Sequence, residues 1–179
     1  MNQNLKLITP EAKYLQSYLA SLVEDKDEKA KADFEKRLVG SEGSIEKLAK
    51  AMQLGGGEIR VDNGQIYQRV PEYWYWLVDD NEYIGSLRVR TELNEFLKEY
   101  GGHVGYDVRG SQRRKGYATQ MLALGIPYLK ELGLEKVFIT CDESNTASRK
   151  VIESNGGVLQ DVVKLDYRPV ETRRYWLKV

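Results

Sequence analysis

The sequence predicts an α/β fold of the mixed α+β kind, built around a mostly antiparallel sheet. The chain has 179 residues, 41% of them hydrophobic, which is enough for a single domain with a buried core. Its first third has helical periodicity. From residue 103 onward the order is strand, helix, strand, helix, strand, strand. A strand-helix-strand unit implies a parallel pair with a right-handed crossover, so the sheet is mixed.

Composition excludes several function classes. The 27 basic and 27 acidic residues give no net charge, and therefore no global field to hold a nucleic acid or a membrane surface. Cys141 is the single cysteine and His103 the single histidine, so neither an intrachain disulfide nor a Cys/His zinc site is expected. With no signal-like or membrane-spanning run, we expect a cytoplasmic protein.

The first third is expected to be helical. A hydroxyl residue, a proline and an acid at residues 9–11 form a helix start signal, and apolar residues at helical spacing follow over residues 15–22 and 34–52. After three consecutive glycines, Asn63 and Gly64 have the composition that closes a small hairpin.

The central part has strand patterns. Residues 73–78 are aromatic and aliphatic, residues 79–82 form a turn, and residues 83–89 give the second strand of an antiparallel hairpin. A short amphipathic helix over residues 93–100 separates this hairpin from a strand over residues 103–108.

The last part alternates helices and strands. A helix over residues 117–132 ends at Gly133. The remaining elements are a strand at 137–140, a helix at 146–154, and two strands at 158–163 and 174–179.

The turn between the strand ending at residue 108 and the next helix carries the chemical signal. It contains Arg109, Arg113, Arg114 and Lys115 and opens onto the helix through Gly116. The first turn of a helix leaves backbone N–H groups without partners and attracts anions, and a glycine permits close approach. Four cations beside such a group of free N–H donors suit a pyrophosphate. The two common phosphate-loop patterns, GxxxxGK[ST] and GxGxxG, are absent.

This stretch resembles the GNAT N-acetyltransferase superfamily, whose acyl-CoA motif has the form [QR]xxGx[GA]. Here the motif is Arg113-Arg114-Lys115-Gly116-Tyr117-Ala118. The strand VFITCD follows, and residues 145–156 match the superfamily's second motif, which begins with asparagine and ends with glycine. The resemblance covers residues 73–179, the acyl-CoA-binding core. Residues 1–70 form a variable helical part.

The resemblance implies helices on both faces of the sheet and acetyl-CoA as cosubstrate, without a metal. It also implies that the strands ending at Val108 and near Thr140 splay apart, so that pantetheine pairs with their free backbone groups. The N–H of Val108 would face the thioester oxygen. Asn145 would contact pantetheine, cap its helix, or do both. The expected cofactor-binding residues are Val108, Arg113, Arg114, Lys115, Gly116, Tyr117, Ala118, Thr119 and Asn145.

Two residues are catalytic candidates. His103 stands where related sequences often carry a glutamate, so we expect either a general base or a structural histidine bonded to its neighbours. Many members place a tyrosine seven residues after the motif asparagine as the acid, but this position holds Ile152. Ser148 is a possible replacement as hydrogen-bond donor to the sulfur, or it bonds only within its own helix. A CoA thiol also leaves as its anion, so no acid is assigned.

The sequence therefore predicts an N-acetyltransferase that moves an acetyl group from acetyl-CoA to a primary amine by direct attack in a ternary complex. The alternative is a catalytically weak or inactive acyl-CoA-binding or sensing module. The acceptor, a small-molecule or peptide amine, and the formation of a homodimer are left open by the residues.

Overall fold

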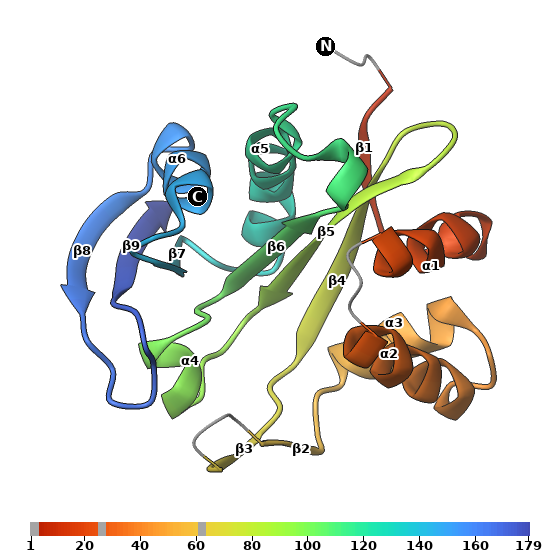
Figure 1. Ribbon diagram of the computed structural model, residues 1–179, viewed down its shortest axis with the longest axis horizontal. Helices are drawn as coiled ribbons and strands as arrows, with labels where there is room; N and C mark the ends of the chain where they lie inside the picture. Colours follow the sequence, from red (N-terminus) through yellow and green to blue (C-terminus); the bar gives the residue numbers. More distant parts are fainter. Residues whose placement is uncertain (1–3, 25–27, 61–63) are drawn as a thin grey trace.

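The computed structural model describes residues 4–24, 28–60 and 64–179. Its larger sheet has the strand order β1-β4-β5-β6, and all neighbours in it are antiparallel (Figure 1). These strands are β1 (Lys6–Ile8), β4 (Glu72–Val78), β5 (Tyr83–Arg90) and β6 (Val104–Val108). The hairpin predicted over residues 73–89 is therefore confirmed. The edge strand β1 was not predicted, because three residues are too few to show a period.

A second sheet contains the C-terminal strands. It has the order β7-β9-β8, with β7 (Lys136–Asp142), β9 (Thr172–Lys178) and β8 (Val158–Val163) paired antiparallel. Within the described ranges no ladder joins β6 to β7. The two sheets meet where the backbone N–H of His103 donates to the Phe138 carbonyl at 2.7 Å, and the strands diverge from there (Figure 1).

Helices cover both faces of the larger sheet. On one face lie α1 (Leu15–Glu24), entered through the short 3₁₀ turn Ala12–Tyr14, then α2 (Glu28–Gly40) and α3 (Ile45–Gln53). On the other lies α5 (Tyr117–Glu131), followed after β7 by α6 (Thr146–Ser154) (Figure 1). The predicted α/β fold, with antiparallel strands and helices on both faces, is confirmed. The expected parallel pair does not join one mixed sheet, because in the described ranges β6 and β7 share no ladder and every ladder is antiparallel.

Side-chain alternation along β4 explains the two cores. Trp74 and Trp76 pack with α1, α2 and α3, whereas Tyr75 and Leu77 pack in the cluster that includes α5. A strand buried on both sides reads as a continuous apolar run, which is the pattern seen at residues 73–78.

Three smaller elements complete the fold. β2 (Glu58–Arg60) pairs with β3 (Ile66–Gln68), which confirms the hairpin, although Asn63 lies outside the described residues. The helix α4 (Glu95–Glu99) is capped by Asn94, whose side chain accepts from the Leu97 amide at 2.9 Å. A 3₁₀ turn, η2 (Gly110–Gln112), follows β6. None of the helices in the described ranges combines the length and apolar composition that crossing a bilayer requires.

Candidate active site

The junction between β6 and α5 leaves a set of backbone amides without partners. Gly116 is the N-cap of α5, with φ +81°, and is exposed. The first bond at this end runs from the Gln120 amide to the Gly116 carbonyl at 3.1 Å. Within the described part of the chain, the amides of residues 114–119 donate to no backbone carbonyl. The turn therefore presents the anion-binding end of a helix to solvent.

The same turn holds a strained residue. Arg114 has φ +64°, a left-handed conformation that costs a non-glycine residue roughly 1–2 kcal/mol. Strain of this kind persists only where the surrounding structure enforces it. The shape of the turn is therefore imposed by the fold.

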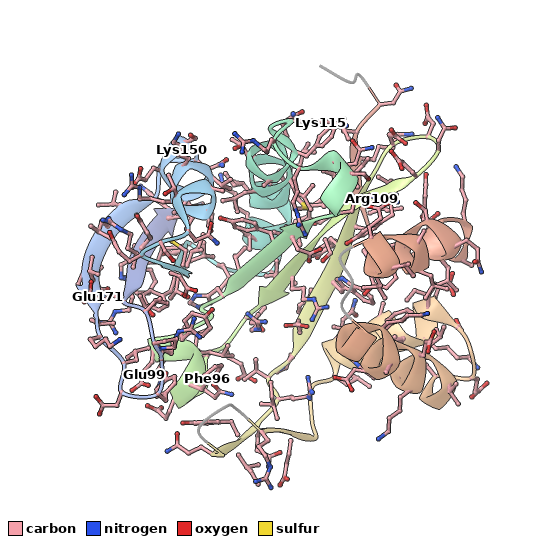
Figure 2. The ribbon with its side chains drawn as sticks, in the orientation of Figure 1. Phe96, Glu99, Arg109, Lys115, Lys150 and Glu171 are labelled. Carbon is pink, nitrogen blue, oxygen red and sulfur yellow. The ribbon has the colours of Figure 1, made fainter. Side chains whose placement is uncertain are left out.

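The cations of the turn are not equivalent. The Arg113 Nε donates to the Val108 carbonyl at 2.9 Å, and the Lys115 Nζ donates to the Gln112 side chain at 2.7 Å. Figure 2 shows Lys115 at the start of α5 and Lys150 on α6 at the same edge of the molecule. Lys150 was not singled out in the sequence, because a lysine on an exposed helix face carries no motif.

Arg109 corrects one expectation. The sequence predicts four cations beside the free N–H groups at the start of α5, but the Arg109 side chain is only 7% exposed. Its guanidinium pairs with Glu24 and with Glu82, the latter at 2.9 Å, and also donates to the Ser17 hydroxyl at 3.0 Å. Arg109 therefore ties the end of β6 to α1 and is not available to a phosphate.

The direction of the Val108 amide follows from the bond made by its neighbour. The neighbouring Arg109 N–H donates to the Ile84 carbonyl on β5 at 3.0 Å. Successive amides of a strand point to opposite sides. The Val108 N–H therefore points away from β5, toward the space in which β6 and β7 diverge.

Ser148 faces a partner from β6. The phenolic oxygen of Tyr106 lies 2.8 Å from the Ser148 hydroxyl and also donates to the Ser148 carbonyl at 3.2 Å. Asn145 caps α6, accepting from the Ser148 amide at 2.9 Å, so the capping role predicted for it is confirmed. Burial raises the pKa of Tyr106 well above its ordinary value, so its hydroxyl stays protonated.

His103 is held by the second sheet. The Phe138 amide donates to its Nδ1 at 2.9 Å, so the neutral ring carries its proton on Nε2. Burial, together with the charge of Arg90, lowers the pKa of His103. A proton taken up at Nδ1 would displace the Phe138 amide. This geometry favours the structural alternative, and the role of base stays a prediction.

Asp107 is a carboxylate that sequence reasoning missed. It precedes Val108 on β6 and is exposed on the sheet face that carries α1, α2 and α3, opposite Ser86 in the ladder. Its carboxylate accepts from the Ser86 hydroxyl at 2.5 Å and from the Tyr83 phenol at 3.3 Å. Finding Asp107 requires the register of β5 and β6, which a single sequence does not give.

Ile152, where many members carry the acid tyrosine, is fully buried in the core and takes no part in this site. Cys141 is also buried and adjoins Ser148. Burial raises the pKa of its thiol, and the hydrogen bond with the Ser148 side chain opposes this shift only in part.

Comparisons with known proteins define the class. The sequence profile of the acetyltransferase (GNAT) domain matches residues 7–158. Because the match covers most of its length, the chain belongs to the GNAT acetyltransferase family. Comparison with curated proteins finds no match.

Solved structures share the fold at low sequence identity. RimL, a ribosomal alpha-N-protein acetyltransferase in complex with coenzyme A, is 15% identical with a TM-score of 0.64, over 99% of this chain and 95% of that chain. A ribosomal-protein alanine acetyltransferase from Vibrio fischeri is 14% identical with a TM-score of 0.66, over 98% and 93%. MccE, a microcin self-immunity acetyltransferase in complex with acetyl-CoA and AMP, is 12% identical with a TM-score of 0.63, over 99% and 94%.

Proposed function

We propose that this protein transfers an acetyl group from acetyl-CoA to a primary amine by direct attack in a ternary complex. Residues 73–179 would bind the cosubstrate, and the helical N-terminal part would form the acceptor side. The observation that carries the proposal is the set of unpartnered amides at residues 114–119, beside two strands that share no ladder within the described ranges.

The pyrophosphate of acetyl-CoA would bind at the start of α5. The amides there point to solvent without a backbone partner, and Gly116 has no Cβ to obstruct a phosphate. Arg113, Arg114 and Lys115 would supply positive charge at this turn. Arg109 would not, because Glu24 and Glu82 neutralise it.

The pantetheine arm would occupy the space between β6 and β7. Both strands carry backbone groups without ladder partners on the facing sides, and an extended ligand satisfies such groups as an added strand does. The thioester oxygen would then accept from the Val108 amide, where negative charge develops in the transition state.

The acceptor must reach the thioester as a neutral amine. Asp107 is the exposed carboxylate adjacent to Val108, so we assign to it the binding of the ammonium and the removal of its proton. The amine nitrogen attacks the thioester carbon, the N–C bond forms and the C–S bond breaks. The nitrogen loses its second proton to solvent. The sulfur leaves as a thiolate, to which the Ser148 hydroxyl would donate a hydrogen bond while Tyr106 holds that hydroxyl in place.

Two measurements on the purified protein test the proposal. Calorimetry with acetyl-CoA tests binding, and release of the CoA thiol with mass detection of acetylated product, over a panel of amines, tests transfer. We expect binding and amine-dependent release. Binding without transfer to any amine supports the sensing alternative, and failure to bind acetyl-CoA overturns both.

A further inference from the structure

A cavity of about 650 Å³ lies over the sheet face opposite α5. It is bordered by α2, α3 and α4 and by the strands β4 and β5. This volume is in the range typical of small-molecule sites. Its walls include apolar side chains from α3 and α4, among them Leu48, Met52 and Phe96.

The cavity is strongly basic. Four guanidinium groups line it, those of Arg37 on α2, Arg69 after β3, and Arg88 and Arg90 on β5. Among the described lining residues Glu72 is the single acid. In a chain with no net charge, this is a local concentration of positive charge around a cavity that is open to solvent on one side.

Glu72 neutralises only part of this charge. It pairs with Arg90 at 2.7 Å and with Arg88 at 3.6 Å. Within residues 4–24, 28–60 and 64–179, neither Arg37 nor Arg69 pairs with a carboxylate. Arg69 donates through Nε to the Glu58 carbonyl at 3.3 Å, which leaves its charge uncompensated.

The arginines also repel one another. Burial is the main cause that lowers the pKa of Arg37, and the nearby charges of Arg88 and Arg69 lower it further, while the charge of Glu72 offsets this only in part. A half-buried guanidinium beside like charges is unfavourable unless an anion compensates it. The five donors of a guanidinium fit a carboxylate or phosphate in a bidentate geometry.

The basic cavity adjoins the proposed reaction centre. Arg88 pairs with Gly105 in the ladder between β5 and β6, and Gly105 precedes Val108 by three residues, about 10 Å at 3.3 Å per residue. Asp107 occupies the same sheet face as Arg88, because its ladder partner Ser86 is two residues from Arg88 on β5. A ligand in the cavity therefore extends from the arginines toward the carboxylate that would receive the amine.

We infer that the cavity is the acceptor site and that the acceptor is a small amine bearing an acidic group, a carboxylate or a phosphate, about 7 Å from its amino nitrogen, since the ladder partner of Asp107 is two residues from Arg88. The acidic group binds Arg37, Arg69 and Arg88, and the amino group lies at Asp107. This inference rests on the proposed acetyl transfer for the identity of the reaction. The anion site itself stands on the cavity and its charges.

The first test measures the anion site alone. Glutarate, a dicarboxylate without an amine, is titrated calorimetrically into protein saturated with CoA, so that the turn at α5 is occupied. We expect saturable binding, weakened at least about tenfold by Arg37→Gln, the loss of one charged hydrogen-bonding group. Lys36→Gln, the same charge change at an exposed neighbour on α2, should leave glutarate binding unchanged. Absence of binding, or equal loss in both variants, overturns the inference.

The second test measures selectivity. Pairs of amines that differ only by an acidic group, such as 6-aminohexanoate and hexylamine, are compared as acceptors together with acidic N-terminal peptides. We expect kcat/KM to favour the acidic small amine at least about tenfold, and Arg37→Gln to remove the preference. Equal use of both members of each pair overturns the inference while leaving acetyl transfer intact. A preference for the peptides shows a protein acceptor and overturns the small-molecule class. Failure to bind acetyl-CoA, in contrast, overturns the proposed function. The anion site is then tested by glutarate binding alone.

Discussion

The phenol of Tyr106 on β6 lies 2.8 Å from the hydroxyl of Ser148 on α6. This bond connects the two halves of the molecule at the place where, among the described residues, their strands share no ladder. Because burial raises the pKa of Tyr106, its hydroxyl stays protonated, and the pair can donate a hydrogen bond to a negatively charged group between the strands. The hydroxyl that the sequence lacks at Ile152 is thus available from a different element.

Loss of either hydroxyl should slow the transfer. We expect Ser148→Ala and Tyr106→Phe each to lower kcat by about 10- to 100-fold, since a hydrogen bond to a charged group contributes about 1.5–3 kcal/mol when departure of the thiolate limits the rate. The double variant should be little worse than either single one, because the two groups act as a unit. Ser144→Ala, at an exposed serine just before α6, is the control. Unchanged kcat in both variants would show that the sulfur leaves without assistance.

A carboxylate at the start of α5 should abolish binding of acetyl-CoA. We expect Gly116→Glu to weaken binding beyond detection, because the new charge lies where the phosphates bind. The matched control is Gly133→Glu, since Gly133 is exposed at the other end of the same helix and has φ +80°. Both variants carry a left-handed glutamate costing roughly 1–2 kcal/mol, so thermal unfolding should shift similarly. Equal affinity for acetyl-CoA in the two variants argues against the pyrophosphate site.

Asp107 should control the chemical step. We expect Asp107→Asn to lower kcat by about 100-fold or more, the scale of a lost general base, with little change in the affinity for acetyl-CoA. Asn keeps an acceptor for the Ser86 hydroxyl, so the fold is retained. Steady-state kinetics with the best amine of the panel measures the effect, and a variant with full kcat removes Asp107 from the mechanism.

His103 should matter for stability more than for rate. Its replacement by alanine leaves the Phe138 amide without an acceptor, which costs about 1–3 kcal/mol of unfolding free energy. We expect His103→Asn, whose side-chain oxygen can accept this bond, to recover most of the loss, and both variants to keep the pH–rate profile of the parent. If the profile instead loses a limb in both variants, His103 is the base.

Unfolding at low pH should show how much the ion pair between Glu24 and Arg109 stabilises the fold. The hydrogen bond from Arg109 lowers the pKa of Glu24 from 4.5 to about 2. A depressed pKa in the folded state stabilises the fold fully above the unfolded value, and this stabilisation is lost as the pH falls from about 4.5 toward 2. The free energy of unfolding, measured with denaturant, should therefore be larger for the parent than for Glu24→Gln, and this difference should shrink as the pH falls over this range. A difference that does not change with pH would mean that the ion pair does not contribute.

Much of the fold could be predicted because its signals are local. The apolar run at residues 73–78 and the glycine before α5 each depend on neighbours a few positions away. The helix start predicted at residues 9–11 is wrong, because the cap is Glu11, without a side-chain hydrogen bond, and only a 3₁₀ turn precedes α1 at Leu15. The short strand β1 could not be predicted, since its three residues form a strand only by pairing with β4.

By itself, the sequence determined the family and the order of the helices and strands from β4 onward, and it predicted an anion-binding turn at Gly116. Only the tertiary structure decided which charges are free. Arg109 and Glu24 are 85 residues apart yet neutralise one another, while Arg37, Arg69 and Arg88 come from three elements and converge on one cavity. Pairing between distant residues depends on strand register and helix packing, which sequence spacing does not encode. For that reason the sequence could predict an acetyl-CoA site near Gly116, whereas the acceptor side could only be proposed from the tertiary structure.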